Sequence, residues 1–149
     1  MTCAVGALLC WSCKESGPLP ETLDSPARTA EEELKTFQIE SGFEVQLVAS
    51  EPLVESPVII HFDEDGRLWV VEMRGYMSDI EGSEEKLSVG SVAILEDTDG
   101  DDLMDKRTVY LDSLIMPRAL GLFKNGAMVA ENNKLWITQD LDGDWKADS

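Results

Sequence analysis

One acidic segment of nine residues occurs twice in this chain, and it limits the available folds more than any other feature. The copies are DTDGDDLMD at residues 97–105 and DLDGDWKAD at residues 140–148, with aspartate at the first, third, fifth and ninth positions and glycine at the fourth. They begin 43 residues apart, and each follows a short β-type run, ILE at 94–96 and ITQ at 137–139. This recurrence predicts a repeat of small structural units.

The residues before the two acidic segments repeat as well. GRLWVVE at 66–72 and GAMVAE at 126–131 each follow a turn and end in glutamate, so both halves have the order strand, turn, strand, strand, acidic segment. The turn glycines are 60 residues apart, because the first half carries an additional polar segment at 74–90. Four short strands in a unit of about 40–50 residues are typical of a β-propeller blade. A β-sandwich is the alternative.

Period-two alternation at 43–50, further short apolar runs and tight-turn signals locate the other elements. Thr29 and Glu32 form a capping-box pattern, which predicts a short helix that ends before Ser41. Asp65-Gly66 and Asn125-Gly126 predict tight hairpin turns. Strands are expected at 43–50, 58–62, 67–73, 91–96, 106–111, 120–123, 127–130 and 135–138.

The expected fold class is all-β, with a short helix followed by a partial β-propeller of about two blades over residues 29–149. A propeller closes with about four to eight blades. We therefore expect this region to be the N-terminal part of a longer propeller domain. Without further blades, its sheet edges would be exposed.

The N-terminal region carries the signals for export. Residues 1–13, MTCAVGALLCWSC, form an apolar run shorter than the about 20 residues that span a bilayer. The run fits the hydrophobic part of a signal peptide, and a cleavage-box pattern makes Cys13 a candidate lipidation site; a disordered N-terminus is the alternative. Cys10 and Cys13 have haem-attachment spacing, but Lys14 stands in place of histidine. Residues 14–28 contain three prolines and predict a flexible tether.

Charge and cysteine content restrict the partners and the chemistry. The formal net charge of −18, from 30 acidic and 12 basic residues, disfavours nucleic acid and anionic lipid as partners. Membrane contact is expected only through the candidate lipid anchor. All three cysteines lie within the first thirteen residues. Disulfides across the fold and a thiol active site in its body are therefore excluded.

The acidic segments predict calcium sites, because calcium takes six to eight oxygen ligands and closely spaced carboxylates repel one another without a cation. An EF-hand is disfavoured, since its glycine stands at position six and Thr108 replaces its bidentate glutamate. Magnesium fits less well because it keeps its waters. The alternative is a turn whose aspartates accept bonds from backbone amides. The candidate ligands are Asp97, Asp99, Asp101, Asp105, Asp140, Asp142, Asp144 and Asp148, with the backbone carbonyls of Leu103 and Lys146.

Other candidate residues are few. His61, the one histidine, is interpreted as a packed or surface strand residue, which leaves a Ser/His/Asp hydrolase without support. Asp63 and Asp65 are interpreted as a hairpin turn rather than a third cation loop, because no aspartate follows at the ninth position. Arg74 and Tyr76 are candidate cofactor contacts; loop residues without function are the alternative.

Two stretches carry a resemblance to a known family. TAEEELKTFQIESGFEVQLVASEPLVESPVIIHFDEDGRLWVVEMRGY at 29–76 and ILEDTDGDDLMDKRTVYLD at 94–112 resemble membrane-bound dehydrogenase-type propellers, many of which carry a C-terminal haem-binding domain. Their fold is similar to that of soluble quinoprotein glucose dehydrogenases. The resemblance implies a calcium-bearing propeller in the bacterial periplasm or cell envelope. It also implies oxidation of a small-molecule or carbohydrate alcohol with pyrroloquinoline quinone, or electron transfer to a haem.

Two functions are consistent with these expectations. The first is the N-terminal portion of a quinoprotein-type oxidoreductase, whose partners are the remaining blades and a cytochrome c-like domain. Neither Cys-x-x-Cys-His nor a matching catalytic histidine or quinone contact occurs here, so the redox residues are expected in other blades. The second is a calcium-stabilised extracytoplasmic binding or scaffolding propeller without chemistry.

Overall fold

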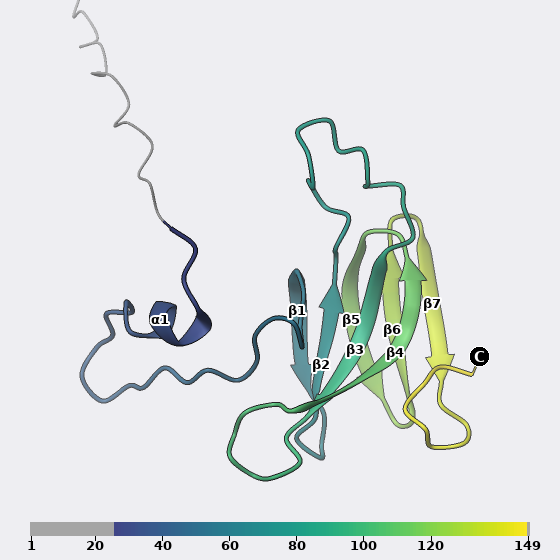
Figure 1. Ribbon diagram of the computed structural model, residues 1–149. Helices are drawn as coiled ribbons and strands as arrows, with labels where there is room; N and C mark the ends of the chain where they lie inside the picture. The colour runs from purple at the N-terminus through teal and green to yellow at the C-terminus, as the bar shows by residue number, and fades with distance from the viewer. Residues whose placement is uncertain (1–25, 149) are drawn as a thin grey trace, which may run out of the picture.

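The computed structural model describes residues 26–148, which form two antiparallel β-sheets after one short helix (Figure 1). The first sheet has the strand order β1-β2-β3-β4 and the second has the order β5-β6-β7. The elements are α1 (Ala30–Leu34), β1 (Pro57–Phe62), β2 (Leu68–Glu72), β3 (Gly90–Glu96), β4 (Lys106–Leu114), β5 (Pro117–Phe123), β6 (Gly126–Glu131) and β7 (Lys134–Gln139). The predicted all-β class is confirmed.

Both sheets begin as the same three-stranded meander. In the first, β1 pairs with β2 and β2 with β3; in the second, β5 pairs with β6 and β6 with β7. Pro57 lies opposite Glu72 and Pro117 lies opposite Glu131, and the pairing is irregular directly after each proline. The predicted order of strand, turn, strand, strand and acidic segment therefore occurs in both halves. The first sheet gains its fourth strand from β4.

A hydrophobic core fills the space between the two sheets. The first sheet contributes Trp69, Val71, Val92, Ile94 and Tyr110, and the second contributes Leu120, Ala127 and Val129. The rings of Trp69 and Tyr110 meet edge to face, with centroids 4.7 Å apart. Burial of these aliphatic and aromatic side chains is the main force that holds the sheets together.

The outer face of the first sheet is covered as well. Leu68, Val70, Leu95 and Met104 form a second cluster, against which Val48, Ala49, Leu53 and Val54 pack. All five residues of β2 are consequently buried. The run LWVVE is apolar on both faces, which suits a strand with packing on each side.

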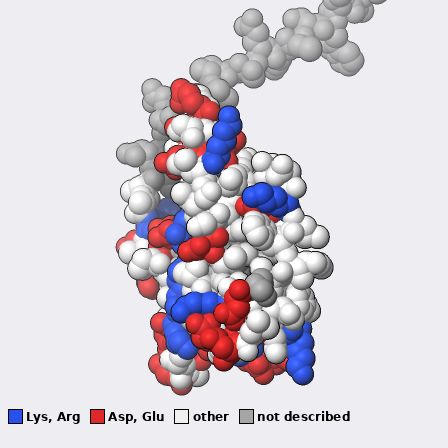
Figure 2. Space-filling view, turned by 90° about the vertical axis from the view of Figure 1, so that its right-hand side faces the viewer, with Lys and Arg blue, Asp and Glu red and all other residues white. Residues whose placement is uncertain are grey.

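The outer face of the second sheet, by contrast, is open in the described part of the chain. Met128, Leu135 and Ile137 are 43%, 63% and 64% exposed. Figure 2 views the molecule from the right-hand side of Figure 1 and shows a wide area without charged side chains, while charged groups gather at its lower end. An apolar sheet face of this kind is typical of an interaction surface.

Seven of the eight predicted strands are present, with boundaries shifted by one to three residues. The strand predicted at 43–50 is wrong: this segment is extended but belongs to neither sheet, and Phe43 is 76% exposed. Its alternating pattern is real, but a strand needs a hydrogen-bonded neighbour, and no described strand runs beside it. The predicted helix start is confirmed, since Thr29 and Glu32 form the reciprocal capping box of α1.

The two hairpin turns differ in detail. Gly66 adopts a φ of +82°, as the predicted turn requires. In the second turn, however, the left-handed residue is Asn125, with a φ of +60°, and Gly126 already belongs to β6. A Cβ atom on Gly126 would lie 2.2 Å from the carbonyl oxygen of Thr138, so this glycine serves close strand packing instead of the turn.

The predictions for the export signal, for Cys13 and for the tether up to residue 25 lie outside the described residues. Within residues 26–148, no helix is long and apolar enough to cross a membrane.

Candidate metal sites and an adjoining cavity

The two acidic segments have the same backbone conformation, and their first aspartate sets it. Asp97 accepts bonds from the backbone N–H groups of Gly100 at 2.7 Å and Asp102 at 2.9 Å. Asp140 accepts the equivalent bonds from the amides of residues 143 and 145, at 2.7 and 3.0 Å. The capping role that the sequence offered as the alternative to metal binding therefore exists at this position.

The ninth aspartate closes each segment. Asp105 accepts bonds from the hydroxyl of Thr98 at 2.8 Å and from its amide at 3.3 Å. Asp148 accepts a bond from the amide of Leu141 at 2.8 Å. Each ninth residue also donates its own N–H to the strand before the segment, at 3.0 Å in the first copy and 2.9 Å in the second. The segments are thus compact loops joined to the ends of β3 and β7.

Each loop brings three carboxylates together. In the first loop these are Asp97, Asp99 and Asp105, and in the second they are Asp140, Asp142 and Asp144, with one oxygen from each within 4.8 Å of the others. Two oxygens on opposite sides of a calcium ion lie about 4.6–5.2 Å apart. The clusters therefore have the dimensions and the oxygen chemistry that fit this cation.

The remaining predicted ligands are outside these clusters. Asp101 accepts the amide of Leu103 at 2.9 Å, and Asp148 closes the second loop as described. The two loops therefore select different third carboxylates from the same motif, position nine in the first and position five in the second. The carbonyl ligands assigned to Leu103 and Lys146 stay predictions.

The electrostatics of the two loops also differ. In the first loop the charge of Asp101, with smaller contributions from partial desolvation and from the charges of Asp105 and Asp97, raises the pKa of Asp99. In the second, Lys146 pairs with Asp144 at 3.1 Å and lowers the pKa of that carboxyl. The first loop holds an unrelieved repulsion that a cation would remove, whereas the second already contains a positive charge.

The second loop docks onto the first sheet. Trp145 stacks on Arg67, whose guanidinium carbon lies 3.8 Å from the ring centroid, and Ala147 donates its N–H to the carbonyl of Tyr110 at 2.8 Å. Trp145 has a left-handed φ of +63°, a conformation that costs a large side chain free energy. The first loop has Asp102 at the same position, with a φ of +69°. The cation–π contact between Trp145 and Arg67 offsets the free-energy cost of the left-handed conformation.

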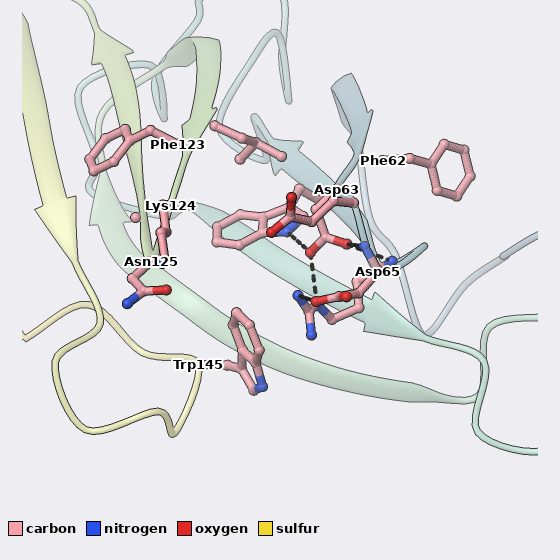
Figure 3. Close-up of a pocket in the computed structure, with 12 residues that line it drawn as sticks. Phe62, Asp63, Asp65, Phe123, Lys124, Asn125 and Trp145 are labelled. Carbon is pink, nitrogen blue, oxygen red and sulfur yellow. Dashed lines mark hydrogen bonds and ion pairs between the residues drawn. The ribbon is translucent and has the colours of Figure 1, made fainter.

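Beside Trp145 lies a cavity of about 430 Å³ between the β1–β2 turn and the β5–β6 turn (Figure 3). Asp63 lies in its wall and accepts bonds from Arg67 at 2.7 Å and from the Trp69 indole at 2.9 Å. Burial raises the pKa of Asp63, but the bonds from Trp69 and Arg67 outweigh burial and leave the pKa below its ordinary value. Asp63 is therefore an engaged anion of a hairpin turn, in agreement with the sequence interpretation.

This cavity was not among the features predicted from the sequence. Its other wall carries Phe123, Lys124 and Asn125, and Phe62, which is 58% exposed, lies at its edge (Figure 3). With Asp63 engaged, these groups are suited to holding a ligand by contact and hydrogen bonding. One signal in the sequence was available, because the second acidic segment has a tryptophan where the first has aspartate.

A buried carboxylate network is the strongest polar feature of the first sheet. Glu72 is fully buried and accepts bonds from Ser91 at 2.7 Å, Arg107 at 2.8 Å, Arg74 at 2.5 Å and the amide of Glu55 at 3.0 Å. Burial raises the pKa of Glu72, but these bonds and the charge of Arg107 outweigh it and hold the pKa below 4.5. The network anchors the start of β1 to the end of β2.

The second sheet also has a buried glutamate at the end of its second strand, with fewer partners. Glu131 is buried, accepts the amide of Ile115 at 2.5 Å and pairs with Lys134 at 3.4 Å. Each glutamate therefore binds the amide two residues before the proline that opens its sheet. The sequence contained the signal, since both second strands end in glutamate.

The remaining candidate residues are dispersed. Arg74 is held by Glu72 and by Glu55, at 3.2 Å from the latter, so its guanidinium already has partners. Tyr76 is 53% exposed, and His61 is exposed on β1. The surface position of His61 agrees with the sequence interpretation.

Comparison with known proteins yields one match. A family model described as a domain of unknown function (DUF7133) matches residues 29–149, from the N-cap of α1 onward. No curated protein and no solved structure matches the chain.

Proposed function

The chain belongs to the family of the domain of unknown function DUF7133, and from this premise we propose that residues 29–149 form a calcium-stabilised part of an exported β-propeller. The observation that carries the proposal is the first acidic loop, where Asp97, Asp99 and Asp105 converge within 4.8 Å and repel one another. A divalent cation would turn this repulsion into attraction.

The role proposed for the cation is structural. The first loop connects β3 to β4, and the second leads from β7 to its contact with Tyr110. A cation in either loop would stabilise the folded state in proportion to its affinity, by about 2.7 kcal/mol at a concentration one hundred times its Kd. Calcium would thus hold neighbouring strands in place without taking part in a reaction.

The repeat supports the propeller part of the proposal. Two sheets with the same order of elements stack face to face, and each places a proline opposite a buried glutamate. The outer face of the second sheet is apolar and exposed where the equivalent face of the first sheet is covered. Stacking of further sheets of the same kind would continue this arrangement.

Calcium titration tests the metal site directly. We expect calcium to raise the Tm of the protein, with tight binding lost in Asp99→Asn and retained in Asp142→Asn. Isothermal titration calorimetry measures the affinities, and circular dichroism without calcium shows whether each variant is folded. Identical melting of calcium-loaded and calcium-free protein, with no calcium retained after gel filtration, would overturn the proposal.

The enzymatic function is proposed for the full-length protein on the resemblance to dehydrogenase-type propellers. It would oxidise a sugar-like alcohol with pyrroloquinoline quinone, or pass electrons to a haem, using residues outside this chain. The non-catalytic scaffold is supported by the engagement of Arg74, the one charged candidate contact, by two carboxylates. Dye reduction by the full-length protein with calcium, quinone and a panel of sugars distinguishes them, because silence across the panel favours the scaffold.

Export to the cell envelope completes the proposal. The apolar run at residues 1–13 supports a signal peptide with lipidation at Cys13. Fractionation of cells that express the native protein and Cys13→Ala tests this part. We expect the native protein in the membrane fraction and the variant released from it.

A further inference from the structure

The cavity beside Trp145 is formed by parts of both sheets. The β1–β2 turn and the β5–β6 turn supply its opposite walls, and the second acidic loop supplies Trp145 between them (Figure 3). Contacts within the chain hold these segments together. Asp140 donates its N–H to the carbonyl of Asn125 at 2.9 Å, and Trp145 stacks on Arg67. Both walls and the loop between them are therefore fixed by residues 62–145 themselves.

The size and the lining of the cavity suit a small molecule. Its volume of about 430 Å³ lies within the range of about 300–1,000 Å³ that is common for ligand pockets. Such pockets combine apolar and aromatic walls with a few polar groups. Here Phe62, Phe123 and Trp145 supply aromatic surface, and Phe123 is 40% exposed. The cavity thus offers ring surface to a ligand that also has polar groups.

The charges of the lining disfavour a charged ligand. Asp63, Glu64 and Asp65 stand against Arg67 and Lys124. The first and third of these carboxylates pair with Arg67 at 2.7 and 2.6 Å, so their charges are largely compensated. An anion would be repelled by the carboxylates, and a cation would be repelled by the two basic groups. The lining therefore favours a ligand without net charge.

Two polar side chains of the β5–β6 turn are available to such a ligand. Within residues 26–148, neither Lys124 nor Asn125 has a side-chain hydrogen bond or ion pair, and both extend from the wall opposite Asp63 (Figure 3). The ammonium group of Lys124 has three donors, and the amide of Asn125 has two donors and an acceptor. Hydroxyl groups, which both donate and accept, match this set.

We propose that the cavity is a carbohydrate-binding site, in which Trp145 and Asn125 hold a neutral sugar ring. The polarised C–H groups of a sugar ring pack against aromatic surface, whose electron-rich face attracts them, while its hydroxyls bond to Asn125 and Lys124. The site holds its ligand without a reaction. It is therefore separate from the redox centre of the proposed function, which lies outside this chain, and it does not depend on that centre.

Comparison of the two loops supports a role for the tryptophan beyond loop structure. Asp102 occupies the equivalent position of the first loop with nearly the same left-handed conformation, at a φ of +69° against +63° for Trp145. The loop conformation therefore does not require a tryptophan, and a large side chain is the more costly choice there. Strained residues of this kind concentrate at functional sites. At position 145 the tryptophan gives the cavity its aromatic wall.

Titration of the 149-residue protein with neutral sugars tests the inference. Glucose, galactose, N-acetylglucosamine and cellobiose are added up to about 50 mM, which detects millimolar affinities, while ¹H–¹⁵N spectra are recorded with calcium and with EDTA. We expect saturable shifts of the Trp145 indole N–H and the Asn125 side-chain amide. The indole of Trp136, which does not line the cavity, should stay unchanged.

Three outcomes of this titration overturn the proposal. They are the absence of saturable shifts with every sugar, shifts confined to residues outside the cavity, and tighter binding of acetate or ethylammonium than of any sugar. The calcium-dependent melting that tests the proposed function is measured without sugar. Failure of the sugar site and failure of the calcium site are therefore recognised separately.

Two asparagine variants make the test specific. Asn125→Gly keeps the left-handed turn, at a φ of +60°, and removes the amide. It should weaken sugar binding about fivefold or more, whereas Asn133→Gly, in the β6–β7 turn at the opposite end of the second sheet, should change it less than about twofold. Equal effects of the two variants overturn the assignment. The backbone amide spectrum of each variant shows that both sheets are retained.

Discussion

The two acidic loops begin with the same residues and adopt the same backbone conformation, but their surroundings direct them to different tasks. The first joins β3 to β4, buries Met104 in the second cluster, and holds carboxylates that repel one another. The second carries Lys146 against Asp144 and rests on the first sheet through Trp145. A repeated loop can therefore keep its shape, set by one aspartate and one glycine, while the intervening positions change its role.

The same contrast holds for the sheets. The first is packed on both faces and closed at one end by a carboxylate with two arginine partners, whereas the second has one open face and a single lysine beside its glutamate. The first sheet therefore has the larger polar network and the larger share of buried residues. We expect it to dominate the stability of the chain.

The largest expected effect is the loss of the Glu72 charge. Glu72→Gln leaves Arg74 and Arg107 without their shared carboxylate and should lower the free energy of unfolding by about 3 kcal/mol. The matched variant Glu131→Gln should cost about 1 kcal/mol, because a backbone amide and one exposed lysine are its main partners. Urea denaturation monitored by tryptophan fluorescence gives both values. Equal losses would remove the proposed difference between the sheets.

The second prediction concerns the docking of the second loop. Trp145→Ala removes the stacking on Arg67 and part of the packing against the core, so unfolding should become easier by about 2 kcal/mol. Asp102→Ala changes the equivalent, exposed position of the first loop and should alter the stability by less than about 0.5 kcal/mol. Thermal unfolding in EDTA separates these effects from calcium binding. A large loss in Asp102→Ala would show that the sixth position stabilises both loops to a similar extent.

The third prediction is a pH dependence. Glu72 is faced by Arg74, Arg107, Ser91 and the amide of Glu55, which hold its pKa below the ordinary value of 4.5. Its contribution to stability is therefore complete above pH 4.5 and is lost as the pH falls through the lowered, folded-state pKa. The stability difference between the native protein and Glu72→Gln should be constant near neutral pH and shrink under acid. A difference that grows as the pH falls would contradict this assignment.

The smallest expected effect separates the two loops as metal sites. With the first loop disabled by Asp99→Asn, Lys146→Ala removes the cation that competes for Asp144, and calcium should bind the second loop about two- to fivefold more tightly. Lys124→Ala, which removes a lysine outside the loop, serves as the control. Calorimetric titration measures the affinities. Unchanged affinity in Lys146→Ala would show that the ion pair does not limit this site.

The periodic features were readable from the sequence because they depend on nearest neighbours along the chain. Short apolar runs between turn signals place β1 to β7, the capping box places α1, and the aspartate spacing places both loops. The predictions that differ from the structure concern features that depend on a partner distant in the sequence. Segment 43–50 has the pattern of a strand without a neighbour, and Asp101 turns to the amide of Leu103 instead of the cluster. Local pattern cannot supply either fact.

By itself, the sequence determined the repeat, the all-β class and the compact acidic loops. These follow from the recurrence of one motif, from short apolar runs between turns, and from the bonding of one aspartate to its own loop. Only the tertiary structure decided which carboxylates meet, why Glu72 is buried and what Trp145 contacts. Those outcomes depend on residues brought together from separate strands, such as Arg107 with Glu72 and Arg67 with Trp145. The physical reason is that charge pairing and packing depend on which residues lie close together in space, whereas secondary structure and turns depend mainly on residues that are neighbours along the chain.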